Sequence, residues 1–164
     1  MSAPLGPSHA RPRLKPPPPT AVAVELTVPF HDVDVLEVAW HGHYPKYLDL
    51  ARTELLRSRG LDVGDLRALG YRFLLSESYL RHASPLRYAD RFRVLAWLVE
   101  VESRVRIAYQ VVNLTREVLS AEGYTVLVTS EASGRLCLET PAAILERLRG
   151  APGSGPEGSR TPPP

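Results

Sequence analysis

A carboxylate and a His-Gly-His triplet lie close together in the stretch VDVLEVAWHGHYPKYLDLARTELL, residues 33–56. Asp34 comes seven residues before His41, and a helical pattern begins next to the triplet. The first turn of a helix presents unpaired N–H groups and the positive end of the helix dipole, which stabilise developing negative charge on an oxygen. A carboxylate at the position of Asp34 could act as a nucleophile or as a general base.

The same residues also allow structural interpretations. An aspartate ahead of a helix often accepts a backbone hydrogen bond, so Asp34 is also consistent with a simple turn or cap. His31, His41 and His43 raise the question of a metal, but three zinc ligands need a convergent geometry that this spacing does not guarantee, and we predict no metal. A polar lining of the site, or a hydrogen bond that fixes the loop, is the expected role of His41 or His43.

One long helix is expected to follow the triplet. Apolar residues recur there at steps of three or four positions, with charged residues between them: Trp40, Tyr44, Tyr47, Leu48, Ala51 and Leu55. Gly60 suits the left-handed position after such a helix. A shorter helix, DVGDLRAL, is expected over residues 62–69 and ends near Gly70.

The rest of the chain is rich in strand patterns. Residues 21–30, AVAVELTVPF, show the alternation of a half-buried strand. Four longer strands are expected within residues 71–86, 91–103, 104–116 and 122–139. The short connections between them favour antiparallel pairing. TPAAILERLR, residues 140–149, predicts a closing helix with a threonine cap and a proline in its first turn.

This order of elements predicts an α+β domain in which one long helix covers one face of an antiparallel sheet. Such a sheet leaves an edge strand exposed, and edge-to-edge pairing of two subunits would cover it, so we expect a homodimer or a homotetramer. The domain is expected to span residues 21–147. The Pro-rich residues 1–20 and the Pro/Gly-rich residues 148–164 are expected to be disordered tails.

Charge and cysteine content exclude several functions. Residues 21–147 hold 15 basic and 17 acidic side chains, so the domain lacks the basic stripe that nucleic-acid binding requires. No apolar run is long enough for a membrane span. The single cysteine, Cys137, cannot form an intramolecular disulfide, which fits a cytoplasmic protein.

The stretch VPFHDVDVLEVAWHGHYPKYLDLARTELL, residues 28–56, resembles the hotdog-fold acyl thioesterases, in particular the 4-hydroxybenzoyl-CoA thioesterase family. It is similar to that family's Asp-X-Asp pair, short loop, Val-X-aromatic step, small residue with Asn or His before Tyr, and helix passing through Ala-Arg. The segment SPLRYADRFRVLAWLVEVESRVRIAYQV is similar to the family's Pro-Leu-Arg, Asp and strand-pair region. The resemblance runs from about Val24 to Leu145 and implies a hotdog fold, an antiparallel sheet wrapped around one central helix.

The resemblance also implies roles for individual residues. Asp34 corresponds to the family's catalytic carboxylate and Asp32 to a structural one. N–H donors near His41 and Gly42 would hold the carbonyl oxygen, and Gly42 would let the carbonyl approach closely. The expected catalytic residues are thus Asp34, His41 and Gly42, and the expected substrate-binding residues are Trp40, His43, Tyr44 and Arg87. The chain departs from the family at Val35, Leu36 and Glu37, where glycine is usual, so the backbone angles of this loop are restricted.

The expected activity is hydrolysis of an acyl-CoA or acyl-carrier-protein thioester to a free acid and a thiol, without a cofactor. One alternative is a hotdog hydratase or dehydratase acting on an acyl thioester, which the histidines near His41 keep open. Another is a non-catalytic acyl-binding module, which the unusual residues 35–37 suggest. Several arginines could meet the carrier's phosphate or simply be surface charges: Arg81, Arg87, Arg91 and Arg135. Acyl length and the choice of carrier stay open.

Overall fold

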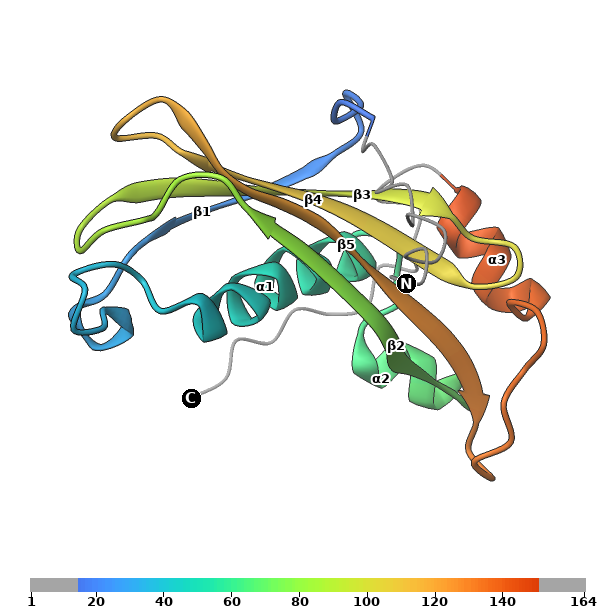
Figure 1. The fold of residues 1–164 in the computed structure, drawn as a ribbon. Coiled ribbons are helices and arrows are strands. Elements are labelled where there is room, and N and C mark those ends of the chain that lie inside the picture. Colours follow the sequence, from blue (N-terminus) through green and yellow to red (C-terminus); the bar gives the residue numbers. More distant parts are fainter. Residues whose placement is uncertain (1–14, 151–164) are drawn as a thin grey trace, which may run out of the picture.

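The computed structural model describes residues 15–150, and its centre is a curved five-stranded antiparallel sheet (Figure 1). The strands run in the order β1-β3-β4-β5-β2. Their bounds are Val22–Thr27 for β1, Tyr71–His82 for β2, Arg91–Glu100 for β3, Val105–Asn113 for β4 and Val118–Glu131 for β5. Each neighbouring pair is antiparallel, as the short connections predicted.

The long helix α1, Tyr44–Arg57, lies against the concave face of this sheet (Figure 1). Its buried face carries Tyr47, Leu48, Ala51 and Leu55, each at most 3 % exposed, so the predicted apolar stripe is confirmed. Side chains of β3 and β4 complete the same core. The chain therefore has the hotdog fold, an α+β arrangement of one central helix wrapped by a sheet.

The start of the long helix differs from the prediction. A 3-10 turn, His41–His43, precedes α1, and Pro45 occupies its first turn. Trp40 lies outside the helix and is 47 % exposed, so its assignment to the buried helical stripe was wrong. Proline fixes a helical φ and has no N–H to satisfy, which favours a helix that begins beside it rather than four residues earlier.

The helix α2, Val63–Ala68, matches its prediction closely. Asp62 caps it, and the Asp62 N–H donates to Asp65 Oδ2 at 2.9 Å. Gly70 follows with φ +82°, and Gly60, after α1, has φ 64°, so both glycines take the left-handed conformation that ends a helix.

The helix α3, Ala142–Arg149, closes the described part of the chain. Its Ile144 and Leu148 belong to the main core, and the helix continues past the domain boundary predicted at residue 147. The predicted threonine cap is wrong: Pro141 holds the cap position, and the Thr140 hydroxyl is buried without a hydrogen-bond partner in the described residues. The predicted tails otherwise lie largely outside the described residues.

The edge strand β2 has no pairing strand on one side among residues 15–150. It pairs with β5 on its other side, through a register shift between Leu75 and Glu77. Leu74 and Leu75 are 45 % and 55 % exposed. The neighbouring strand β5 begins at Val118 and ends at Glu131. Residues 132–139 therefore form a turn and bridge segment instead of the end of the strand predicted over residues 122–139.

Candidate active site

Asp34 begins a tight loop between the 3-10 turn Phe30–Asp32 and the start of α1. Its N–H donates to the Val38 carbonyl at 2.9 Å, and its Oδ1 accepts from the Leu36 N–H at 2.8 Å. One carboxylate oxygen therefore holds the turn, as the structural interpretation predicted. No hydrogen bond to Oδ2 is found among residues 15–150, so the second oxygen is free to meet a substrate or a water.

The tip of the loop carries the residues that depart from the family pattern. Glu37 adopts φ 61°, a conformation that costs a residue with a side chain on the order of 1 kcal/mol relative to glycine. Val35 and Leu36 are 97 % and 75 % exposed. The loop thus keeps a left-handed position without glycine, and it presents two apolar side chains to the outside.

Asp32 is a buried carboxylate that joins this loop to α1. It is 1 % exposed; its Oδ2 accepts from the Tyr47 hydroxyl at 2.6 Å and its Oδ1 from Lys46 Nζ at 2.9 Å. Burial alone would raise the pKa of Asp32, but the hydrogen bonds from Tyr47 and Lys46 and the charges of His43 and Lys46 outweigh it and lower the pKa. The Asp32 carbonyl also accepts from the Trp40 N–H at 2.9 Å, so one residue fixes both ends of the loop to the helix.

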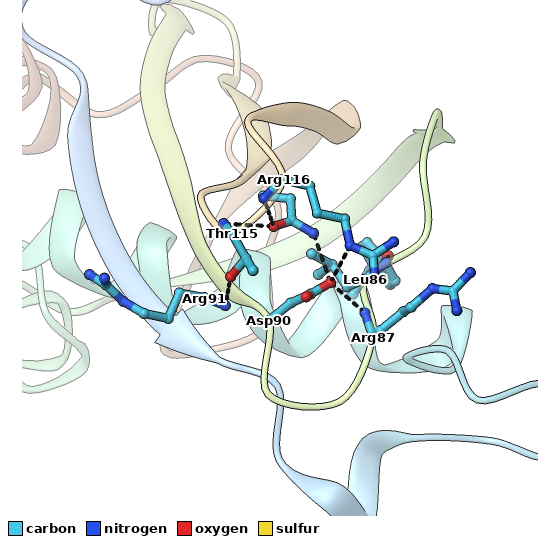
Figure 2. Close-up of polar contacts among 8 residues, drawn as sticks. Leu86, Arg87, Asp90, Arg91, Thr115 and Arg116 are labelled. Carbon is cyan, nitrogen blue, oxygen red and sulfur yellow. Dashed lines mark hydrogen bonds and ion pairs between the residues drawn. The ribbon is translucent and has the colours of Figure 1, made fainter.

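A second buried carboxylate, Asp90, holds the loop from the other side. Its Oδ2 accepts from the Arg87 N–H at 2.9 Å and from Asn113 Nδ2 at 2.8 Å. Figure 2 shows the Arg116 guanidinium turned toward Asp90, with Nε 3.6 Å from Oδ2, while the side chains of Arg87 and Arg91 extend away from it. These bonds shape the turn that the Asp34 loop contacts.

That turn joins the loop through its backbone. The Ala39 N–H donates to the Leu86 carbonyl at 2.8 Å, and Val38 pairs with Arg87 in an isolated bridge. The Leu86 N–H in turn donates to the Tyr44 hydroxyl at 3.3 Å. The loop that carries Asp34 is therefore fixed between α1 and the segment after β2.

The predicted donors lie at the start of the 3-10 turn. Residues at this position have no acceptor within the helix for their N–H groups, and no hydrogen bond from the N–H of His41 or Gly42 is found among residues 15–150. The ring of Trp40 covers Gly42 so closely that an added Cβ would lie 2.2 Å from it. Trp40 also packs against His41 and His43, with ring centroids 5.2 Å and 5.4 Å apart. An alanine at position 42 would therefore force the exposed Trp40 ring to move.

His82, at the end of β2, lies beside the start of α1, and sequence reasoning did not single it out. Its ring meets Tyr44 edge-on, with centroids 4.6 Å apart. Burial lowers the pKa of His82, and the charge of His41 lowers it further. The strand pattern placed His82 within the strand expected over residues 71–86 but gave no sign that it faces the helix start.

The remaining predicted residues fall into two groups. His43 is half-buried with Nε2 3.6 Å from Asp32 Oδ1, and Tyr44 is 2 % exposed within the core, so both support the loop directly. Arg87 contributes its backbone to the loop, and its exposed side chain contacts no acidic group among residues 15–150. Contact of these residues with a substrate stays a prediction. No cluster of three metal-ligating side chains occurs within residues 15–150.

A cavity of about 460 Å³ lies at the other end of α1, between that helix, α2 and β2. Leu56, Leu66, Phe73 and Leu75 are among its apolar walls, and Arg52, Arg67 and Arg72 are its basic residues. Asp34, His41 and Gly42 do not line it. Within one chain, the candidate catalytic loop and this cavity are therefore separate.

Solved structures confirm the class of fold. A hypothetical protein from Aquifex aeolicus matches with a TM-score of 0.70 and 26 % identity, over 77 % of this chain and 98 % of that one. A 1,4-dihydroxy-2-naphthoyl-CoA thioesterase from Synechocystis matches with a TM-score of 0.69 and 17 % identity, over 78 % and 95 %. A protein from Staphylococcus aureus solved in complex with CoA gives 0.73 and 14 %, over 86 % and 89 %.

The chain belongs to the thioesterase-like superfamily, whose model matches residues 28–148. A curated relative from Aquifex aeolicus, named "Putative esterase", is 30 % identical over 74 % of this chain and 93 % of its own length. A second relative, from Synechocystis, bears a similar name and is 31 % identical over 72 % of each chain. Among the described residues, no helix is both long and apolar enough to cross a membrane.

Proposed function

We propose that this protein hydrolyses acyl thioesters to a free acid and a thiol, with Asp34 as the catalytic carboxylate. The observation that carries the proposal is the fixed Asp34 loop, which is held between two buried carboxylates. In the chain this loop leads to His41 and Gly42, whose N–H groups have no acceptor among residues 15–150. Family membership supports the general activity. The CoA-bound relative, and the relatives named as CoA thioesterases, support CoA as the carrier.

In the proposed reaction, the N–H groups of His41 and Gly42 hold the thioester oxygen as it gains negative charge. Asp34 then acts in one of two ways. It attacks the carbonyl carbon and forms a mixed anhydride with release of the thiolate, and water later cleaves the anhydride; or it removes a proton from a water that attacks directly. Both routes give one acid and one thiol and need no cofactor.

We further propose that two copies pair through the free edge of β2. Exposed apolar residues on this strand support such an interface, because a lone chain leaves them in water. Leu74 and Leu75 are 45 % and 55 % exposed. By contrast, the other edge strand, β1, is only six residues long.

Antiparallel pairing of β2 with its copy, centred on the strand, would bring the Tyr71 end of one strand beside the His82 end of the other. His82 contacts Tyr44 at the start of α1, and Tyr71 lines the cavity. The cavity of one copy would then face the Asp34 loop of the other. This arrangement gives the acyl group a pocket that the catalytic loop lacks in a single chain.

Because a lone cysteine leaves the chain without an intramolecular disulfide, we propose that this enzyme works in a cytoplasmic environment. The choice between hydrolysis and hydration is open to direct test. A hydratase or dehydratase would change the acyl chain and leave the thioester intact.

The decisive experiment is Asp34→Asn, followed by thiol release from a panel of acyl thioesters. Loss of a catalytic carboxylate is expected to lower kcat by about a hundredfold or more. Glu37→Gln, on the same loop, is the matched control and should keep most of the activity. Retained turnover in Asp34→Asn, or an altered acyl chain with no free thiol, would reject the proposal.

A further inference from the structure

The cavity between α1, α2 and β2 is more basic than the domain around it. Three arginines and one aspartate line it, Arg52, Arg67, Arg72 and Asp62, whereas residues 21–147 as a whole carry more acidic than basic side chains. Small-molecule binding sites are typically lined by apolar side chains with a few charged or polar groups at the margin. Its volume of about 460 Å³ lies within the range of roughly 300–1,000 Å³ that such sites occupy.

Two of these arginines have no charge partner in the described residues. Asp62 is paired with Arg57, at 2.9 Å between Oδ2 and Nε, and Arg52 is paired with Asp49. No acidic side chain among residues 15–150 lies within ion-pair distance of Arg67 or Arg72. The cavity therefore carries two uncompensated guanidinium groups, which are suited to a carboxylate because they donate in a planar fork.

The apolar walls of the cavity indicate that the rest of such an anionic ligand is apolar. Leu56 from α1, Leu66 from α2, and Phe73 and Leu75 from β2 surround the same space. A ligand that satisfies both parts has an apolar body and an anionic end. A purely apolar acyl chain would leave the arginines without a partner.

We infer that this cavity receives the acyl group of the substrate and selects acyl groups that end in a carboxylate, such as the half-thioesters of dicarboxylic acids. This inference rests on the proposed function, and on the pairing that brings the cavity to the Asp34 loop of a second copy. Arg67 and Arg72 are the specificity-determining residues, and the apolar walls accommodate the methylene chain. The carrier's phosphates are the competing source of negative charge.

The test compares adipoyl and hexanoyl thioesters, which differ in the terminal carboxylate. Each acyl group is presented on CoA and on N-acetylcysteamine, which has no phosphate. The measured quantity is the ratio of kcat/KM for adipoyl to that for hexanoyl, in wild type, in the double variant Arg67→Gln/Arg72→Gln, and in Arg104→Gln. Arg104 is an exposed arginine paired with Glu100 outside the cavity, so it is the matched control.

We expect the wild-type ratio of kcat/KM to exceed one on both carriers. The ratio should fall about tenfold in the double variant, because two exposed charge-assisted hydrogen bonds together contribute roughly that factor to substrate preference. It should be unchanged in Arg104→Gln and should decrease with added salt. Because both substrates are measured on one preparation, the ratio does not depend on the fraction of folded protein. A wild-type ratio at or below one overturns the inference. So does a ratio that the arginines affect only on the CoA carrier, since the anion would then be phosphate.

Calorimetric titration of the full chain with hexanoate and with hexan-1-ol separates this inference from the proposed function, because these ligands share a six-carbon chain and only hexanoate carries a carboxylate. Tighter binding of hexanoate, lost in the double variant Arg67→Gln/Arg72→Gln, supports the anion-selecting pocket even if Asp34→Asn leaves hydrolysis intact. Equal binding of the two ligands, with thioester hydrolysis that depends on Asp34, supports the proposed function and rejects the anion-selecting pocket.

Discussion

Replacement of Asp32 by alanine is expected to destabilise the protein by about 2.5–4.5 kcal/mol. The Tyr47 hydroxyl donates to Asp32 Oδ2 at 2.6 Å in a buried setting, and a hydrogen bond to a charged group contributes on the order of 1.5–3 kcal/mol. The alanine variant also leaves the Tyr47 hydroxyl without an acceptor, which costs a further 1 kcal/mol or so. The Lys46 side chain is 52 % exposed, so its ion pair adds roughly 0.5 kcal/mol or less.

The assay is urea unfolding at neutral pH, with Asp49→Ala as the matched control. Asp49 is on the same helix and is also ion-paired, but it is 60 % exposed, so its loss should cost less than about 0.5 kcal/mol. If both variants unfold at the same midpoint, the buried carboxylate contributes no more than a surface one. The interpretation of Asp32 as the anchor of the catalytic loop would then be wrong.

The pH dependence of the same difference provides a second check. The pKa of Asp32 in the folded state lies below its ordinary value of 3.8, so in the interval between the two the unfolded chain binds more protons. The stability from Asp32 is therefore fully present above pH 3.8 and is lost as pH falls through the folded pKa. The gap between wild type and Asp32→Ala should shrink under those acidic conditions. A gap that stays constant would refute the assignment to an ionised carboxylate.

Three further results are expected at the loop and its surroundings. Glu37→Gly should raise the free energy of unfolding by about 0.5–1 kcal/mol in urea titrations, because glycine adopts φ 61° without strain; a loss of stability would contradict this. Gly42→Ala should shift Trp40 fluorescence and lower thiol release, since its Cβ meets the ring at 2.2 Å, and Trp40→Ala should restore space in the double variant. The pKa of His82, measured by NMR titration, should lie below 6.5, and His41→Ala should raise it. Because folding lowers this pKa, the contribution of His82 to stability is greatest above pH 6.5 and decreases as pH falls. A measured His82 pKa above 6.5 would contradict this prediction.

The sequence was most informative where a local rule sets the structure. The short helix was predicted over residues 62–69 with its end near Gly70, and α1 was predicted from its apolar spacing, because glycines and periodicity act within a few residues. The start of α1 was misplaced because Trp40 fits the helical spacing but covers Gly42 from outside the helix. Spacing alone cannot distinguish these two positions.

The candidate site was predictable in part. The motif resemblance indicated Asp34 and the donors near His41, and their roles stay predictions. The absence of glycine from residues 35–37 predicted a restricted backbone, but Glu37 adopts the left-handed conformation that glycine favours. The contacts that fix the loop could not be predicted, because Asp90 and His82 reach it from segments about fifty residues away in the chain. These contacts depend on strand register and on the path of the turn after β2. Neither can be deduced from the local sequence pattern.

The end of α1 and the helix α3 hold each other through two arginines. Arg147 donates to the Gly60 carbonyl, and Arg59 donates to the carbonyls of Leu148, at 2.8 Å, and Gly150. Each segment thus supplies the hydrogen bonds that the other one's terminal carbonyls lack. Neither end can fray without exposing the other, so backbone amides of the two segments should exchange with deuterium as one cooperative unit, although 89 positions separate Arg59 from Leu148.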